Sequence, residues 1–346
     1  MPQSQDPTVM IPQYLVHPEI DLSGQEIRLF ELTSAPGARL VEGIFHIVAL
    51  HDPIAYTALS YTWGDSGKVK SIKVGGKRLK ITQNHFGFLH SWDTSKLERP
   101  SLFWIDAICI DQTNLMERNH QVGLMKKIYT QAAKVLVWLG QEADNSDLVM
   151  KYMATQASAP LKRRGCGYRR IWTRDEGRAL VALCERGYWR RIWIIQEIIH
   201  ARTITVLCGE KSFEWISFEK LYAKLKTLEL ENWILHHDFA GGVLHSSACV
   251  MVWQRAYWRH PQTPTPRLRT LLDAFQNWKC SDVRDMVYGL LAMIDEDSGV
   301  VVDYSKSVED LYEEVHVREV IYGSVNANDY QRFRNLLRQV LKRAQY

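Results

Sequence analysis

The fold is decided by residues 102–139, which read LFWIDAICIDQTNLMERNHQVGLMKKIYTQAAKVLVWL. Two apolar runs, 102–110 and 135–139, stand on either side of a polar segment with helical spacing. Asn114 is a favourable N-cap for that helix, and Glu117 follows three residues later, as in a capping box. A strand, a helix and a strand in this order predict a βαβ unit with parallel strands. Since both runs are apolar throughout, we expect helices on both faces of the sheet.

Other segments of the chain predict further members of this sheet and the helices around it. Residues 28–32, 56–63 and 203–208 have the composition of strands, and residues 71–82 predict a hairpin around the Gly75-Gly76 turn. Amphipathic spacing predicts helices over residues 84–92, 147–156, 173–185, 283–294, 308–321 and 330–343. The pattern indicates an α/β fold with a parallel sheet flanked by helices.

The chain is longer than one typical domain, and its pattern changes along its length. Residues 1–50 are expected to form an N-terminal arm and the first strand, because prolines interrupt the arm. Residues 51–210 are expected to form the α/β domain. Residues 211–346 are expected to form a mostly helical C-terminal region.

The composition argues against several classes of protein. Of the 346 residues, 46% are hydrophobic, which is typical of a packed globular protein. The net charge of +4 is too small to indicate a nucleic-acid partner by itself. No apolar run is long enough to span a membrane, and the N-terminus has no signal-peptide pattern. The six cysteines form no Cys-x-x-Cys pair and the histidines lack zinc spacing, which favours reduced thiols, a cytoplasmic location and no metal.

Polar residues follow the predicted strands at their carboxyl ends, where open α/β sheets bind ligands. The backbone N–H groups at the start of the helix after residue 114 could hold an anion, and an arginine there would add a charged fork. No dinucleotide-binding glycine pattern and no phosphate-binding loop is present. The candidate ligand-binding residues at these strand ends are Trp63, Gly64, Asp65, Asp106, Asp111, Arg118 and Gln121.

A later segment, residues 187–197, reads GYWRRIWIIQE and places Glu197 four residues after Trp193. On a helix these two side chains lie on one face, opposite a core stripe of Ile192, Ile195 and Ile199. A carboxylate beside an indole on a half-apolar helix is desolvated, which raises its pKa and suits catalysis. The alternative is a surface glutamate beside an aromatic patch.

Three segments of the chain closely resemble the three blocks of the fungal heterokaryon incompatibility (HET) domain. They are residues 56–65 (YTALSYTWGD), 103–112 (FWIDAICIDQ) and 190–197 (RRIWIIQE). The likeness extends over about residues 56–320, with Asp111 at a position where the family often has Asn. The resemblance implies a HET domain over the α/β part of the chain and a role in allorecognition and programmed cell death.

The HET domain is in turn distantly similar to Toll/interleukin-1 receptor (TIR) domains, which implies a TIR-like parallel sheet. In enzymatic TIR domains, a glutamate four residues after a tryptophan is catalytic in cleaving the nicotinamide–ribose bond of NAD. Glu197 has this spacing, although Ile194 stands where the TIR segment has Cys. The resemblance therefore implies an NAD(P) glycohydrolase with Glu197 as the catalytic residue, Trp63 or Trp193 stacked on a ring and Arg118 at a phosphate. NAD(P) is then the substrate, and no further cofactor is implied.

Two other functions are compatible with the sequence. The first is a non-enzymatic death-signalling scaffold that forms homo-oligomers or binds a protein partner, which the tryptophan content and the C-terminal helix favour. The second is a nuclease or nucleotide-processing enzyme that uses Asp65, Asp106 and Asp111 as metal ligands. Cys109, near a predicted strand end, is a further candidate nucleophile.

Overall fold

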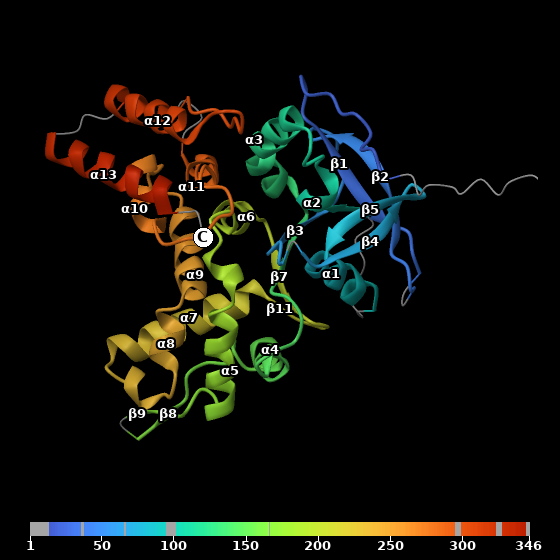
Figure 1. Cartoon of the computed structure of the whole chain (residues 1–346). Helices are drawn as coiled ribbons and strands as arrows, with labels where there is room; N and C mark the ends of the chain where they lie inside the picture. The colour runs from blue at the N-terminus through green and yellow to red at the C-terminus, as the bar shows by residue number, and fades with distance from the viewer. Residues whose placement is uncertain are drawn as a thin grey trace, which may run out of the picture.

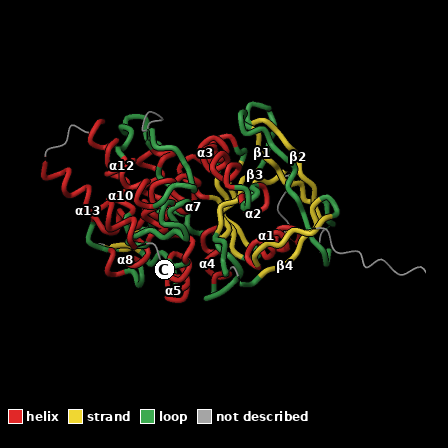
Figure 2. The backbone as a smooth tube through the Cα atoms, turned by 45° about the horizontal axis from the view of Figure 1, so that its top comes forward, coloured by secondary structure: helices red, strands yellow, loops and turns green. Residues whose placement is uncertain are grey.

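The computed structural model describes residues 14–35, 38–65, 67–94, 102–165, 167–294, 299–322 and 327–343. These residues form a nine-stranded sheet with helices packed around it, followed by a helical C-terminal region (Figure 1). Figure 2 shows the strands gathered on one side of the molecule and most helices on the other. The predicted α/β class is confirmed.

The sheet is mixed rather than parallel throughout. Its order is β11-β10-β7-β3-β6-β1-β2-β4-β5, in which β10, β7, β3 and β6 are parallel neighbours. Strands β11 and β1 flank this centre and pair antiparallel with β10 and β6. The two-residue connection 209–210 reverses the chain direction between β10 and β11. The predicted parallel sheet is confirmed for the four central strands, and the predicted hairpin over residues 71–82 is the antiparallel β4–β5 pair at one edge. The strands are β1 (Glu26–Leu32), β2 (Glu42–Ala49), β3 (Thr57–Tyr61), β4 (Val69–Val74), β5 (Lys77–Thr82), β6 (Leu102–Trp104), β7 (Lys134–Trp138), β10 (Ile204–Cys208) and β11 (Lys211–Glu214).

The predicted βαβ unit is present, with a third strand between its two strands. Strand β3 pairs in parallel with β6 on one side and β7 on the other, so that Ala58 lies opposite both Trp104 and Val135. Strand β6 is shorter than predicted, because residues 106–109 form the one-turn helix α2 (Asp106–Cys109). Asp106 supports this turn, since its Oδ1 accepts a hydrogen bond of 2.8 Å from the N–H of Ala107.

Asn114 caps helix α3 (Leu115–Gln131) as predicted, by accepting a hydrogen bond of 3.2 Å from the N–H of Glu117. The predicted reciprocal bond, between the Glu117 side chain and the N–H of Asn114, was wrong. That carboxylate instead accepts two bonds from Arg28 and one from the N–H of Asp111. A buried guanidinium attracts the carboxylate more strongly than a neutral N–H does.

The helices follow the predicted pattern with one exception. The helix expected over residues 283–294 is divided into α11 and a separate 3₁₀ turn at Leu291–Met293. Helix α11 ends at Gly289, where a Cβ atom would lie 2.9 Å from the carbonyl oxygen of Asp285 and 3.3 Å from Ile192. The remaining elements are α1 (Gln83–Thr94), α4 (Ser146–Thr155), β8 (Arg163–Arg164), β9 (Gly167–Tyr168), α5 (Arg174–Cys184), η1 (Gly187–Arg190), α6 (Ile194–His200), α7 (Trp215–Leu230), η2 (Ile234–His236), α8 (Ala240–Leu244), α9 (Ser247–Trp258), α10 (Leu268–Phe275), α11 (Asp285–Tyr288), α12 (Val308–Tyr322) and α13 (Ala327–Arg343).

Helix α6 lies in the interior. The six residues 194–199 are all buried, including Gln196 and Glu197. The sequence predicted a polar face on this helix, and that expectation was wrong because α3, α9 and β3 pack around it. A helix that is buried all round forces its polar side chains to find partners inside the protein.

The sheet extends across both domain boundaries expected from the sequence. Strands β1 and β2 precede residue 51, and β11 follows residue 210. The division of the chain into domains stays a prediction. Among the described residues, every helix is too short or too polar to span a membrane.

Four of the five described cysteines are buried free thiols, and the fifth, Cys280, is half-buried. Cys166 lies outside the described residues.

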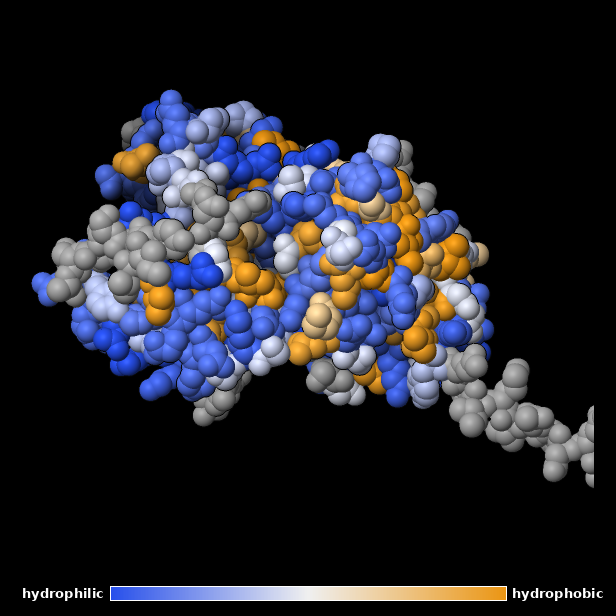
Figure 3. All heavy atoms as spheres, turned by 90° about the horizontal axis from the view of Figure 1, so that it is seen from above, coloured by the Kyte–Doolittle hydropathy of each residue, from blue (hydrophilic) through white to orange (hydrophobic). Residues whose placement is uncertain are grey.

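Hydrophobic side chains also reach the surface on the half of the molecule that carries the sheet (Figure 3). Strand β2 contributes Ile44 and Ile47, which are 40% and 42% exposed.

Candidate functional site

Glu197 is a buried acid held against the end of strand β3. Ser60 donates a hydrogen bond to its Oε2, and the hydroxyl oxygen of Tyr188 lies 2.6 Å from Ser60 Oγ. The three side chains are at most 3% exposed. Burial raises the pKa of Glu197 to about 7, against the opposing effects of Arg191 and the Ser60 hydrogen bond. This direction is the one expected for a desolvated carboxylate.

A second carboxylate, Asp106, lies at the same end of the sheet. Tyr61 donates a hydrogen bond to its Oδ1, and the indole N–H of Trp63 donates one of 3.1 Å to its Oδ2. The charge of Asp106 contributes to the raised pKa of Glu197, so the two acids interact. Trp63 is 40% exposed and Asp106 is half-buried, so this part of the site is open to solvent.

Arg191 supplies positive charge beside Glu197. Its guanidinium donates a hydrogen bond to the carbonyl oxygen of Tyr61 and lies 6.0 Å from the centroid of the Tyr61 ring. Its charge lowers the pKa of Glu197. We refer to the side chains that meet here as the carboxylate cluster: Ser60, Tyr61, Trp63, His85, Asp106, Tyr188, Arg191 and Glu197.

His85 belongs to this cluster, although no pattern in the sequence marked it. Its ring centroid lies 4.3 Å from that of Tyr61 and 6.2 Å from that of Trp63. Thr82 Oγ1 donates a hydrogen bond of 2.6 Å to the carbonyl oxygen of Trp63 and lies 2.6 Å from His85 Nδ1. Because the single hydroxyl hydrogen of Thr82 is engaged, His85 Nδ1 must carry the proton and donate.

The other ring nitrogen of His85 is then a bare acceptor. His85 Nε2 is buried and has no hydrogen-bond partner within the described part of the chain. Burial lowers the pKa of His85 to about 4, which keeps the ring neutral near pH 7. A buried acceptor without a donor is costly to the fold, and a hydroxyl or amide group of a ligand would satisfy it.

Gly64 and Asp65 form the turn that leaves β3. Gly64 has a φ of 74°, a conformation that favours glycine. Asp65 is exposed, and its Oδ1 accepts a hydrogen bond of 2.9 Å from the N–H of Gly67. These two residues shape the loop beside Trp63.

Arg118 and Trp193 lie in a neighbouring cluster around Asp285. The Arg118 guanidinium lies 3.6 Å from the centroid of the Tyr304 ring and 3.9 Å from Asp282. The hydroxyl of Tyr304 donates a hydrogen bond of 2.6 Å to Asp285, to which Trp193 also donates. Burial raises the pKa of Asp285 to about 6. Arg118 is thus engaged by Tyr304 and Asp282 rather than presented beside Glu197.

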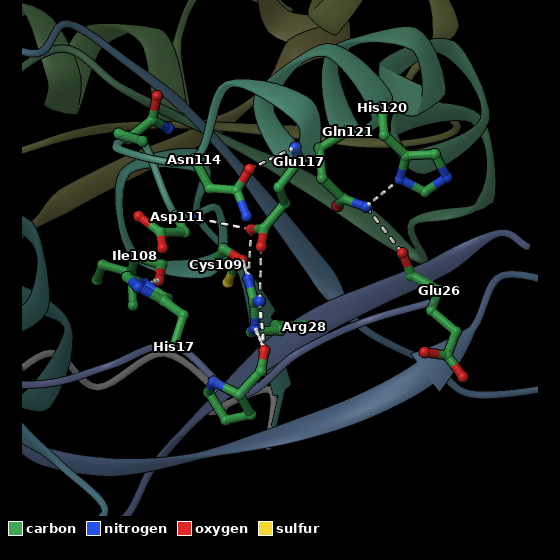
Figure 4. A network of polar contacts seen from close by, with 12 residues as sticks. His17, Glu26, Arg28, Ile108, Cys109, Asp111, Asn114, Glu117, His120 and Gln121 are labelled. Atoms are coloured by element: carbon green, nitrogen blue, oxygen red, sulfur yellow. Dashed lines mark hydrogen bonds and ion pairs between the residues drawn. The ribbon is translucent and has the colours of Figure 1, made fainter. Parts of the chain in front are cut away.

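Asp111 and Gln121 lie in a third network, around the buried ion pair of Arg28 and Glu117 (Figure 4). The two Arg28–Glu117 N–O distances are 2.5 and 2.8 Å. The backbone N–H of Asp111 donates to Glu117 over 2.6 Å, and Gln121 donates to the carbonyl oxygen of Glu26 over 2.8 Å. These contacts hold β1 against the start of α3 and do not bring Asp111 or Gln121 to Glu197.

The structure therefore brings together three of the predicted residues, Trp63, Asp106 and Glu197. Burial raises the pKa of Cys109 to about 12, which leaves its thiol protonated and unreactive. Within the described ranges, no three His, Cys, Asp or Glu residues are arranged to hold a metal ion. The arrangement can stabilise a cationic centre between carboxylates and stack a flat ring on the exposed indole.

Comparison with known proteins shows which family part of this chain matches. Residues 56–197 match the family described as Heterokaryon incompatibility protein (HET). The chain is 29% identical over 202 residues to "Heterokaryon incompatibility protein 6, OR allele" of Neurospora crassa, a match that covers 46% of this chain and 29% of that protein. It is 34% identical over 87 residues to "Vegetative incompatibility protein HET-E-1" of Podospora anserina, covering 24% of this chain and 6% of that protein.

The chain spans less than a third of the length of these two relatives. No solved structure matches it. The matched region contains the three blocks seen in the sequence. Most members of the carboxylate cluster lie within these blocks, whereas His85 and Tyr188 lie between them. Residues 56–197 of this chain thus match the heterokaryon incompatibility (HET) family, and a longer stretch is similar to a heterokaryon incompatibility protein.

Proposed function

We propose that this protein acts in heterokaryon incompatibility as a cell-death effector that hydrolyses the nicotinamide–ribose bond of NAD(P). The two relatives named for incompatibility support the biological role. One observation carries the chemistry. A buried glutamate with a pKa of about 7 shares a cluster with a second acid, an arginine and a solvent-exposed indole, at the carboxyl ends of parallel strands.

Cleavage of this bond develops positive charge on the ribose ring, which a nearby carboxylate stabilises. In the proposed reaction Glu197 faces that charge and Trp63 stacks on the nicotinamide. The bare Nε2 of His85 accepts a hydrogen bond from a donor on the substrate. Water attacks ribose C1 as the C1–nitrogen bond breaks, and Asp106 takes the proton released from the water. The products are nicotinamide and ADP-ribose.

Substrate reaches Glu197 only when its cover moves, because this side chain is 3% exposed. The cover includes Tyr188 and Arg191, both in the segment that leads into α6. We propose that this segment opens transiently in the isolated protein and persistently when the protein self-associates or binds a partner. The proposal assigns the reaction to the cytoplasm, in line with the sequence-based prediction.

The same burial favours a second function, that of a non-enzymatic death-signalling scaffold. In that case the Ser60–Glu197 bond only joins β3 to α6, and the exposed apolar residues of β2 offer a surface to a partner. The two proposals differ in whether NAD is consumed.

Expression of the chain in a fungal host, with growth and cellular NAD followed together, separates them. The enzyme proposal predicts that NAD falls before growth stops and that Glu197→Gln abolishes both effects. Glu210→Gln, at an exposed glutamate outside the cluster, should retain both. Growth arrest by Glu197→Gln with constant NAD would support the scaffold and overturn the enzyme.

A further inference from the structure

A cavity of about 240 Å³ lies apart from the carboxylate cluster. Its walls come from α3, from the end of α6, from the end of α9 with the following loop 263–266, and from residues 292–294. This volume is below the roughly 300–1,000 Å³ of sites for drug-sized ligands, so the cavity suits a small molecule.

The charged groups among the described lining residues are positive. Lys126 of α3 and Arg259 after α9 both line the cavity, and none of the described lining residues is Asp or Glu. Arg259 donates a hydrogen bond of 2.5 Å to the carbonyl oxygen of Ala201, which fixes its position. Two cations in a concave wall concentrate positive potential inside it.

His200, which also lines the cavity, responds to this potential. Its Nε2 lies 3.1 Å from the carbonyl oxygen of Ala292 and therefore carries the proton. Burial lowers the pKa of His200 to about 4, and the charges of Lys126, Arg259 and Arg255 act in the same direction. The charges that act most strongly on this ring are thus all positive.

The rest of the wall carries the hydroxyl groups of Thr263 and Thr265 and an apolar part. The apolar part includes the ring of Trp258, two prolines of the loop 263–266, and Ile199 and Met293. The cavity can therefore accept a ligand that combines an anionic group with an apolar body.

We propose that this cavity binds a small phosphate monoester, with its phosphate against Lys126 and Arg259 and its apolar part against Trp258 and the prolines. A phosphate dianion matches two cations in charge and accepts several hydrogen bonds. The site does not depend on the proposed NAD(P) chemistry. It touches α6 at Ile199 and His200, one turn beyond Glu197, so an occupant contacts the helix that carries the candidate catalytic acid.

Calorimetric titration of the full chain with phenyl phosphate tests this proposal. We expect saturable binding that is about tenfold weaker or more in Lys126→Gln, because one of the two cations is lost. Lys127→Gln is the matched control, since Lys127 is exposed and does not line the cavity. Phenol lacks the charge and inorganic phosphate lacks the ring, so each should bind at least about tenfold more weakly than phenyl phosphate.

A second readout is the pKa of His200, followed by NMR. A bound phosphate should raise this pKa in the wild type, because its charge opposes those of the neighbouring cations. The proposal is overturned if phenyl phosphate does not bind saturably, if Lys126→Gln and Lys127→Gln bind it equally well, or if phenol binds as tightly.

Discussion

Ser60 on β3 donates a hydrogen bond to the carboxylate of Glu197 on α6, and both side chains are buried. This bond joins the first and the last of the three HET blocks in space. The burial of this carboxylate is costly to the fold unless the group is protonated or paired. Burial therefore raises the pKa of Glu197 to about 7, and the acid can change its charge near neutral pH.

Glu197→Gln is expected to change the pH dependence of stability. The carboxyl has an ordinary pKa of 4.5 and a pKa of about 7 in the folded protein, so the folded state binds more protons between these values. The free energy of unfolding of the wild type should therefore fall by about 3 kcal/mol as pH rises through this window. Urea denaturation should show the variant gaining stability relative to the wild type from about pH 5 to about pH 8. The same pH dependence in both proteins would contradict the assignment.

The His85 ring is expected to carry its proton on Nδ1. The reason is that Thr82 gives its hydroxyl hydrogen to Trp63 and accepts from His85. Nitrogen-15 NMR at neutral pH should show one neutral ring with a protonated Nδ1 and a bare Nε2. A ring protonated on Nε2, or a doubly protonated ring near pH 7, would rule out the acceptor role.

Glu117→Gln should be strongly destabilising. It leaves the guanidinium of Arg28, which is 1% exposed, without its compensating charge. We expect a loss of about 3–5 kcal/mol in the free energy of unfolding, measured by denaturant titration. Glu42→Gln breaks the exposed Lys73–Glu42 pair and should cost at most about 1 kcal/mol. Equal losses of stability in the two variants would show that burial of the Arg28–Glu117 pair does not make its disruption more costly.

Tyr304→Phe should destabilise the packing around Asp285. It removes the hydroxyl that donates to the buried Asp285, which should cost about 1–3 kcal/mol and raise the pKa of Asp285 further. Thermal unfolding monitored by circular dichroism measures the loss. Tyr168→Phe is the control and should change little, because within the described residues the Tyr168 hydroxyl bonds to the surface residue Glu231 alone. A Tyr304→Phe variant as stable as this control would argue against the role of the bond.

The sequence predicted the local elements of the fold well, because strands and helices follow from periodicity and caps. It placed β3, β7 and β10 and recognised Asn114 as a cap. It did not predict that β3 lies between β6 and β7, since strand order depends on long-range packing rather than on spacing. It also missed β2 and β11, whose runs were not recognised as strands.

The candidate site was predicted only in part, because local patterns mark single residues but not their distant partners. Trp63, Asp106 and Glu197 stand at strand ends or in a recognisable block, and the structure brings them together. Arg118 and Gln121 were expected there because they begin the helix after β6, but Arg118 stacks on Tyr304 and Gln121 bonds to Glu26. Partners more than 90 residues away along the chain decide where such side chains point, and no local pattern contains that information.

Nicotinamide release from NAD by the purified full chain tests the central claim most directly. We expect a low basal rate, limited by transient opening around Glu197, that rises with pH through about 7 as this acid ionises. Glu197→Gln should lower the rate by about 100-fold or more, whereas Glu210→Gln should leave it unchanged. Release of nicotinamide and ADP-ribose that depends on Glu197 is the predicted result. No release by the wild type, or equal release by Glu197→Gln, would contradict the proposed function.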